Sequence, residues 1–179
     1  MKNFAKFLRR EKSGLAAVEF AFILPVLITM FFGTVELTSA LSCRADVTSL
    51  ASVAADLVAQ QTQITDADMS NVFSALNEIV YPYPTASAKI VITSLIDDGK
   101  NDGKGQVAWS DAQNGTARVV GTYVAVPTGL IVSGGSVILA EVSYSYSSTT
   151  TEYVTGPVTM TNSFYAHPRQ VAQISRVAS

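Results

Sequence analysis

The longest apolar stretch of the chain lies near its start and extends from Leu15 to Leu41. No charged residue falls between Phe20 and Val35. A helix that crosses a membrane needs about 20 mostly apolar residues, so this stretch is long enough. We therefore predict a transmembrane helix over residues 15–41, with Pro25 inside it as the position of a kink or a local opening.

The helical pattern continues beyond the apolar stretch. Five apolar residues recur there with alternating spacings of four and three, which is typical of one face of a helix: Cys43, Val47, Leu50, Ala54 and Leu57. Neither glycine nor proline occurs between Thr34 and Gln63. We therefore predict one continuous helix from about Leu15 to about Gln61. Its second half is amphipathic and needs a partner for its apolar face.

A shorter second helix is expected to begin after Thr65. The Thr65 side chain can cap it, and two aspartates in its first turn favour the positive end of the helix dipole. Pro82 and Pro84 end it, because proline cannot continue a helix. Its predicted buried face consists of Met69, Val72, Phe73, Leu76, Ile79 and Val80.

From Ala88 onward the pattern changes to that of strands separated by glycine-rich turns. The expected strands include residues 90–92, 106–110, 117–126, 136–147 and 152–165, the last broken at Gly156 and Pro157. Strands that follow one another without intervening helices are typical of an antiparallel sheet. The sequence therefore predicts an α+β fold in which one face of this sheet covers the apolar face of the long helix.

Charge is distributed unevenly along the chain. Up to Gly14 there are five basic residues and one acid, whereas after Leu41 there are seven basic and eleven acidic residues. A basic flank beside a membrane helix favours a cytoplasmic position for that flank, which places the remainder on the far side of the membrane. The mild acidity downstream disfavours nucleic acid as a partner, because nucleic-acid binding requires a basic surface.

Few residues offer chemistry for catalysis or for a cofactor. Cys43 is the single cysteine and His167 the single histidine, so neither an intramolecular disulfide nor a histidine-based metal cluster is expected. The segment 97–105 resembles a calcium loop, but Lys100 replaces a ligand and Trp109 stands at the closing glutamate, so a hairpin turn is favoured. Asn114 begins a glycosylation sequon, although Asn-Gly is first a turn signal. We expect neither an enzyme nor a bound cofactor.

Three kinds of segment could explain the apolar stretch. A secretory signal has a shorter apolar core and a small-residue cleavage site, which this stretch lacks. A lipoprotein signal would use Cys43, but the usual leucine three positions earlier is absent and the basic block is too distant. A retained membrane helix, trimmed at Gly14, fits best. Glu19 then lies at the edge of the lipid, where a carboxylate costs a few kcal/mol and requires a partner.

The motif Gly14-Leu-Ala-Ala-Val-Glu-Phe-Ala-Phe-Ile-Leu-Pro25 resembles the N-terminus of the TadE-like pseudopilins of the tight-adherence (Flp) pilus system. The continuation 31–36, which ends at Glu36, also matches that pattern. Segments 55–60 and 166–169 are similar to segments of such proteins, but less diagnostically. Phe20 follows the glutamate where the pilin subunit of this system usually has tyrosine, which favours a minor pseudopilin over the major subunit.

The resemblance implies a pilin-like fold and processing by a membrane prepilin peptidase that cuts between Gly14 and Leu15. The new α-ammonium of Leu15 would pair with Glu19 of the same or a neighbouring subunit, so Glu19 and Phe20 are the expected subunit-assembly residues. The implied partners are the peptidase, other pilins and pseudopilins, the inner-membrane assembly platform and membrane lipid. For Glu36 a plain position among lipid headgroups is favoured over pairing with a neighbouring subunit.

The expected organisation is a basic prepilin leader at 1–14, a transmembrane helix at 15–41 and a periplasmic pilin-like domain at 42–179. The protein would pass once through the bacterial inner membrane. Two alternatives stay open from the sequence: a minor pseudopilin of a type II secretion-like apparatus, and a membrane-tethered periplasmic binding module with no role in a filament.

Overall fold

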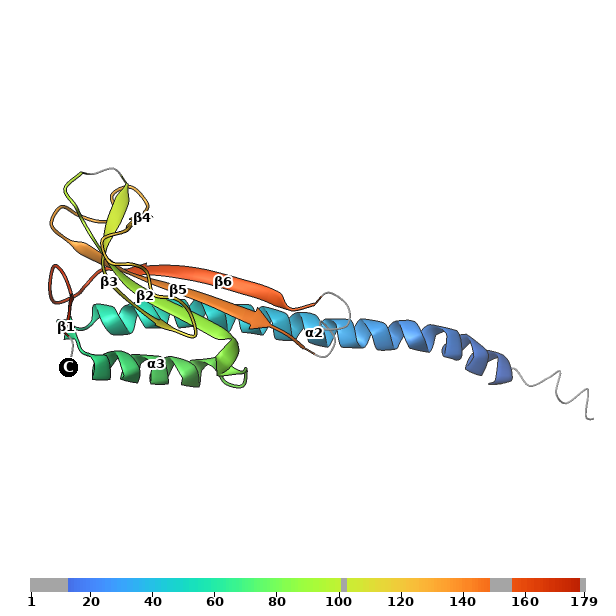
Figure 1. Cartoon of the computed structure of the whole chain (residues 1–179). Coiled ribbons are helices and arrows are strands. Elements are labelled where there is room, and N and C mark those ends of the chain that lie inside the picture. Colours follow the sequence, from blue (N-terminus) through green and yellow to red (C-terminus); the bar gives the residue numbers. More distant parts are fainter. Residues whose placement is uncertain (1–12, 101–102, 149–155, 178–179) are drawn as a thin grey trace, which may run out of the picture. The chain divides into compact units, whose positions relative to one another are not determined.

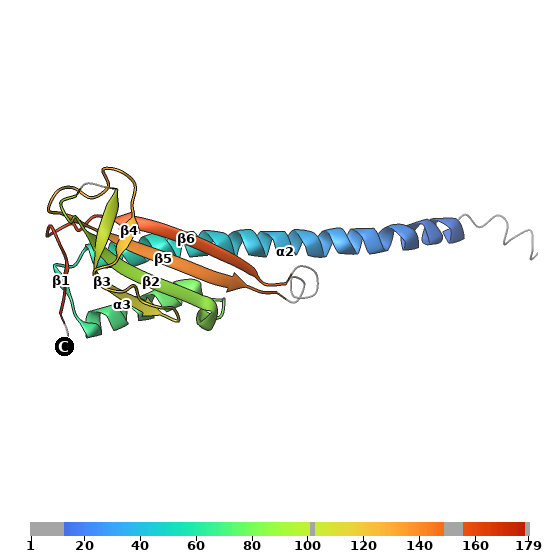
Figure 2. The same cartoon turned by 45° about the horizontal axis from the view of Figure 1, so that its top comes forward.

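The computed structural model describes residues 13–100, 103–148 and 156–177. The chain divides into two units, one up to Leu41 and one from Ser42 onward. A long N-terminal helix, a second helix and a five-stranded antiparallel sheet make up a pilin-like α+β arrangement, which confirms the predicted fold class (Figures 1 and 2). Residues 1–12 of the predicted leader lie outside the described residues.

Helix α2 comprises Ser13–Ala59 and includes Pro25. The predicted continuous helix is therefore confirmed to within two residues at each end. The absence of helix-breaking residues between Thr34 and Gln63 explains its length. Its end is closed by a bond from the Gln61 amide to the Val58 carbonyl, at 3.0 Å.

The buried face of the second half of α2 is broader than the sequence pattern predicts. Cys43, Val47, Leu50 and Ala54 are buried as expected, but Leu57 is only half-buried. A strict spacing of 3.5 residues drifts around a straight helix by about 20° per heptad. Further along the helix the buried positions therefore pass to other small or branched residues: Ala51, Ala55, Val58 and Ala59.

Helix α3 comprises Asp66–Val80, as predicted, and Thr65 caps it. The Thr65 hydroxyl accepts from the Asp68 amide at 3.2 Å, and the Asp68 carboxylate accepts from the Thr65 amide at 3.0 Å. This reciprocal capping box satisfies two amides at the start of the helix. The buried face is narrower than predicted, since Met69, Val72, Leu76 and Val80 are buried whereas Phe73 and Ile79 are half-buried.

Replacing Thr65 by alanine removes the cap, and we expect the free energy of unfolding to fall by about 1 kcal/mol. Bonds from Thr65 also lower the pKa of Asp68. A depressed carboxyl pKa stabilises the fold above its ordinary value, and this stabilisation is lost as the pH falls through the folded pKa. Urea titrations over a pH series test both points, with exposed Thr62→Ala as the control. Equal loss in the two variants would contradict the capping role.

The sheet has the order β4-β3-β2-β5-β6, and every neighbouring pair is antiparallel. Its strands are β2 (Ala88–Ile96), β3 (Lys104–Gln113), β4 (Tyr123–Ala125), β5 (Ser136–Tyr146) and β6 (Val158–Ala166). Both α3 and the second half of α2 lie along one face of the sheet (Figures 1 and 2). This confirms the predicted antiparallel arrangement and its cover over the long helix.

Two predicted strands differ from those observed. Of residues 117–126 only Tyr123–Ala125 form a strand, while Val119 and Val120 lie in a connection with 71% and 65% of their surface exposed. These two valines are therefore apolar residues of an exposed loop and do not belong to the sheet. Of residues 152–165, the strand begins at Val158, and residues 149–155 lie outside the described residues.

The sheet is covered on both faces near the start of β5. Successive side chains of a strand point to opposite faces, yet residues 136–140 are all buried. On the face away from the helices, Leu95, Val107, Val137 and Leu139 form a second core. Partly buried residues pack over it: Val124, Val126, Leu130, Ile131 and Tyr165.

A second, two-stranded parallel sheet was not predicted. It joins β1 (Gln63–Ile64) to β7 (Ser175–Arg176). Two residues are too few for an alternating pattern to be visible in the sequence. Nearby, the buried Trp109 ring nitrogen donates to the Ile174 carbonyl at 2.8 Å, which ties this C-terminal segment to the main sheet.

Candidate functional site

The described helix of the first unit exposes apolar side chains on every side. Every residue from Gly14 to Val35 is exposed, and Phe22 exposes 78% of its surface. In the described part of the chain, α2 is the one helix long and apolar enough to cross a membrane. A helix that is apolar on every side requires lipid or other helices around it, so this helix indicates single-pass membrane anchoring.

Hydroxyl side chains in this segment bond to the helix itself. Thr29 donates to the Pro25 carbonyl at 2.8 Å, and Thr34 donates to the Met30 carbonyl at 2.8 Å. Because lipid offers no hydrogen-bond partner, such internal bonds lower the cost of placing hydroxyls in a bilayer. The bond at Pro25 also occupies a carbonyl beside a predicted kink.

Glu19 is exposed within the first turns of α2. It follows Leu15 by four positions, so the two residues share one face of the helix, about 6 Å apart along its axis. Leu15 and Phe20 expose 63% and 56% of their surfaces. The predicted assembly residues are therefore brought together at one end of the apolar segment and are accessible to a partner.

Glu36 marks the opposite end of the apolar segment. Seventeen positions separate it from Glu19, which corresponds to about 26 Å along a helix. This length is close to the roughly 30 Å hydrocarbon thickness of a bilayer. Glu36 is half-buried and interacts within the chain. The two acids thus bracket a span of membrane dimensions.

Gly14 lies in the first turn described for α2, and a Cβ atom placed there would meet no atom within 4 Å. The fold therefore does not require glycine at this position. Glycine at this position instead suits a partner that approaches the backbone closely.

Cys43 has 1% of its surface exposed and belongs to the buried face of α2. It lies beside Val47, Tyr83 and Tyr144. This confirms its predicted position on the apolar face and removes it from contact with oxidants or metals in solution.

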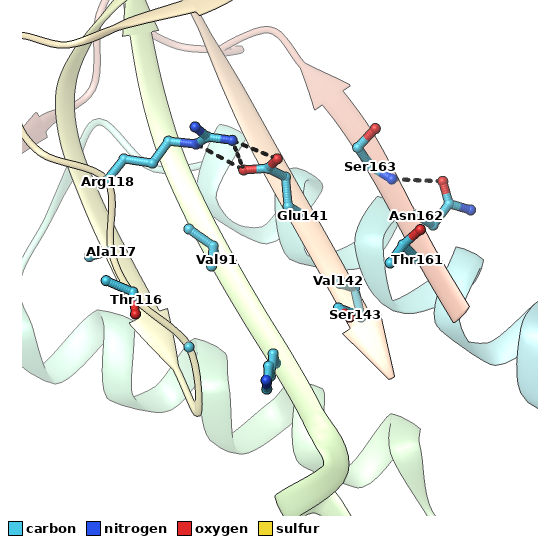
Figure 3. A pocket seen from close by; sticks show the side chains of 12 residues that line it. Val91, Thr116, Ala117, Arg118, Glu141, Val142, Ser143, Thr161, Asn162 and Ser163 are labelled. Carbon is cyan, nitrogen blue, oxygen red and sulfur yellow. Dashed lines mark hydrogen bonds and ion pairs between the residues drawn. The ribbon is translucent and has the colours of Figure 1, made fainter. Parts of the chain in front are cut away.

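The second unit has an open cavity of about 700 Å³ on the sheet face away from the helices. The Arg118 side chain extends across β2, at Val91, to Glu141 on β5, as Figure 3 shows. Its Nε and Nη2 donate to the Glu141 carboxylate at 3.0 and 2.7 Å. Four of the other ten lining residues carry hydroxyl groups, among them Ser143 and Thr161, and Lys89 also lines the cavity. The charges of Arg118 and Glu141 neutralise each other.

The segment after β2 forms a turn and uses its carboxylates internally. Asp97 accepts from the Gly99 and Gly134 amides, both at 3.1 Å. Lys100 donates to Asp98 at 2.8 Å from its side chain and at 3.0 Å from its backbone amide, and these two bonds lower the pKa of Asp98. The Lys100 side chain also donates to the Tyr123 hydroxyl at 3.1 Å. Residues 101–102 lie outside the described residues. The hairpin-turn interpretation accounts for the contacts of both aspartates.

Asn114 adopts a left-handed backbone conformation with φ of 53°, as expected of an Asn-Gly turn. Its side-chain amide donates to the Thr85 and Ala88 carbonyls at 3.1 and 3.0 Å. The nitrogen that a glycan would modify is therefore committed to the fold. His167 is exposed beside Pro168, as the sequence predicts for a surface residue.

The two segments with a weaker resemblance to pseudopilins contact each other. The Arg169 guanidinium pairs with Asp56, and the Arg169 amide donates to the Ala59 carbonyl at 2.9 Å. Gln170 also donates to the Gln60 carbonyl at 2.7 Å. Sequence reasoning noted both segments but missed this clamp, because residues more than a hundred positions apart leave no local pattern.

No group of three or more potential metal ligands occurs among the described residues. No curated protein and no solved structure matches the chain. A comparison with protein families matches the exposed apolar helix and the first turns of its buried continuation. Residues 14–56 of this chain match the model of the TadE-like protein family.

Proposed function

We propose that this protein is a minor pseudopilin that takes part in assembly of a tight-adherence pilus. The observation that carries the proposal is the TadE-like match over residues 14–56, whose N-terminal part falls on a helix with exposed apolar side chains on every side. Proteins of this family are structural components of pili. In this proposal the protein acts by packing its helix against other subunits and not by catalysing a reaction. The second unit, from Ser42 onward, supports this role with a five-stranded sheet that lies along the helices (Figure 1).

The chemistry of assembly centres on Glu19. A carboxylate inside lipid costs about 2.5–3.5 kcal/mol on insertion scales, so it favours any arrangement that pairs it. Cutting after Gly14 supplies an α-ammonium on Leu15, one helical turn away. A neighbouring subunit that buries this pair gains a contact that fixes its register, with Phe20 beside it as an apolar neighbour.

The proposal places residues 1–14 in the cytoplasm, residues 15–41 in the inner membrane and residues 42–179 in the periplasm. Its partners are a prepilin peptidase, other pilins and pseudopilins, and the assembly platform in the inner membrane. The basic charge before Gly14 supports this orientation.

Processing gives the direct test. In cells with the peptidase we expect the mature chain to begin at Leu15, as read by N-terminal sequencing, and in cells without it to retain the leader. Gly14→Leu should block the cut, because its side chain keeps the peptidase from the backbone while the helix itself has room for it.

Gly33→Ala is the matched control, since Gly33 also lies in α2 and a methyl group added there would meet no atom within 4 Å. That variant should be processed like the wild type. A mature chain that begins at Met1, or near Ser42, would overturn the proposal.

A further inference from the structure

A groove of about 380 Å³ lies between α3 and the last residues of β3. The floor and walls include Phe73 and Asn77 from α3, and Asp111, Ala112 and Gln113 from β3. Arg176 closes one end, where it pairs with Asp111 at 2.9 Å and with Asp66 at 2.5 Å. The groove therefore runs along a strand edge beside a helix.

Two buried oxygen atoms in this groove accept no hydrogen bond from the described residues. They are Asn77 Oδ1 and Gln113 Oε1. An unsatisfied buried acceptor costs about 1–3 kcal/mol, so groups of this kind favour a partner that brings donors. Both side chains line the same groove, which makes it a site for N–H or O–H groups.

The adjacent edge of β3 is also open. Strand β4 pairs with β3 only at Lys104, Gly105 and Gln106, and the Val107 backbone bonds to the connection at Gly121 and Thr122. Among the described residues no strand pairs with Asp111–Gln113 on the side away from β2. An open edge offers backbone groups to an added strand.

The opposite edge of the same sheet presents such a strand. β6 pairs only with β5 among the described strands, and none of its nine residues is charged. Val158 and Phe164 expose 44% and 43% of their surfaces. Soluble proteins usually protect an edge with charge, proline or a bulge, so a long uncharged edge indicates a surface that another chain covers.

Strand polarity makes the two edges complementary. β3 and β5 are each antiparallel to β2, and β6 is antiparallel to β5, so β6 is antiparallel to β3. If two copies share one orientation, β6 of one copy therefore meets β3 of the next as an antiparallel pair. This step rests on the proposed function, because a common membrane anchor is what gives the copies a shared orientation.

We propose that the groove between α3 and β3 binds strand β6 of a second copy of this chain. Backbone groups of β6 pair with the open edge of β3, so that the sheet continues from one subunit to the next, and side-chain donors of the incoming strand supply the hydrogen bonds that Gln113 and Asn77 lack. Because the two contacting surfaces differ, the contact is heterologous and is not the self-complementary contact of a two-fold dimer.

Cysteine cross-linking tests this contact. Ala112, Val91, Glu141 and Ser163 form one row across the sheet, so Ala112 and Ser163 of one chain are three strand spacings, or about 14 Å, apart. A disulfide needs Cα atoms within about 7 Å, so a link between these positions must join two chains.

The full-length chains Ala112→Cys and Ser163→Cys are co-expressed in membranes and oxidised mildly. We expect on the order of tenfold more mixed dimer than with Ala112→Cys plus Ser49→Cys, an exposed control position on α2. Thr161→Cys and Thr159→Cys replace Ser163→Cys in parallel, to detect an axial shift of two or four residues. Wild type, whose Cys43 is buried, controls for background.

Gln113→Leu, introduced into the Ala112→Cys chain, removes one unpaired acceptor. It should lower the cross-link yield several-fold without lowering the stability of the isolated chain, because the buried oxygen contributes nothing favourable there. If all three β6 positions cross-link no better than Ser49→Cys, the contact is wrong. Processing at Gly14 is scored in the same cells, so failure of the proposed function remains distinguishable from failure of this contact.

Discussion

Glu19→Gln is expected to abolish assembly of pili while leaving the protein in the membrane. Glutamine keeps the shape of the side chain but removes the charge that pairs with the α-ammonium of Leu15. Removing one partner of a buried ion pair costs about 3–5 kcal/mol, which is enough to prevent incorporation of a subunit. Electron microscopy of pili, with immunoblots of membrane fractions, measures both outcomes.

Glu36→Gln is the matched control for this experiment. Glu36 lies at the other end of the same apolar segment, where we expect a position among headgroups, so its variant should assemble pili normally. A second arm combines Glu19→Gln with Gly14→Leu, and no additional loss is expected because both changes remove the same pair. Normal pili with Glu19→Gln would show that the acid has no role in assembly and would favour a simple membrane tether.

Leu50→Ala is expected to lower the free energy of unfolding of the second unit, from Ser42 onward, by about 2–5 kcal/mol. Leu50 has 1% of its surface exposed and lies beside Val80 and Tyr144, where α2, α3 and the sheet meet. Truncation leaves a cavity that the surrounding elements cannot fill by small shifts. Urea unfolding of the detergent-solubilised chain, followed by fluorescence of the single buried Trp109, measures the loss.

Val119→Ala serves as the control for Leu50→Ala, because Val119 exposes 71% of its surface. Its effect should stay within about 0.5 kcal/mol. Equal losses of unfolding free energy in the two variants would mean that α2 contributes little to the core of the second unit.

Local signals account for what could be predicted from the sequence. The continuation of α2 beyond the apolar stretch follows from the absence of glycine and proline after Gly33, and α3 follows from Thr65 and the two prolines beyond its end. The antiparallel sheet follows from alternation in β5 and from the glycine-rich turns. Each of these signals is contained within a few turns or one strand, so tertiary contacts are not needed to detect it.

What the sequence could not predict depends on distant pairs. The Asp56–Arg169 pair, the Trp109 bond to Ile174 and the β1–β7 pairing all join residues far apart in the chain. The strand prediction at Val119 and Val120 is wrong because apolar residues in an exposed connection have the same composition as sheet residues. For the candidate site, the sequence pointed to Glu19 and Gly14 as candidates. It gave no sign of the two oxygen atoms without hydrogen-bond partners, on Asn77 and Gln113.

The clamp between the end of α2 and the C-terminal segment has a consequence for the order of folding. Arg169, Gln170 and Val177 hold backbone groups of residues 59–64, and Arg176 holds Asp66. A chain is synthesised from its N-terminus, so the full set of these bonds can form only after residue 177 has been synthesised. Contacts of such sequence separation form late and slowly. Until the C-terminal segment has been synthesised, the apolar faces of α2 and α3 remain exposed. During this interval a chaperone or a neighbouring subunit can bind them.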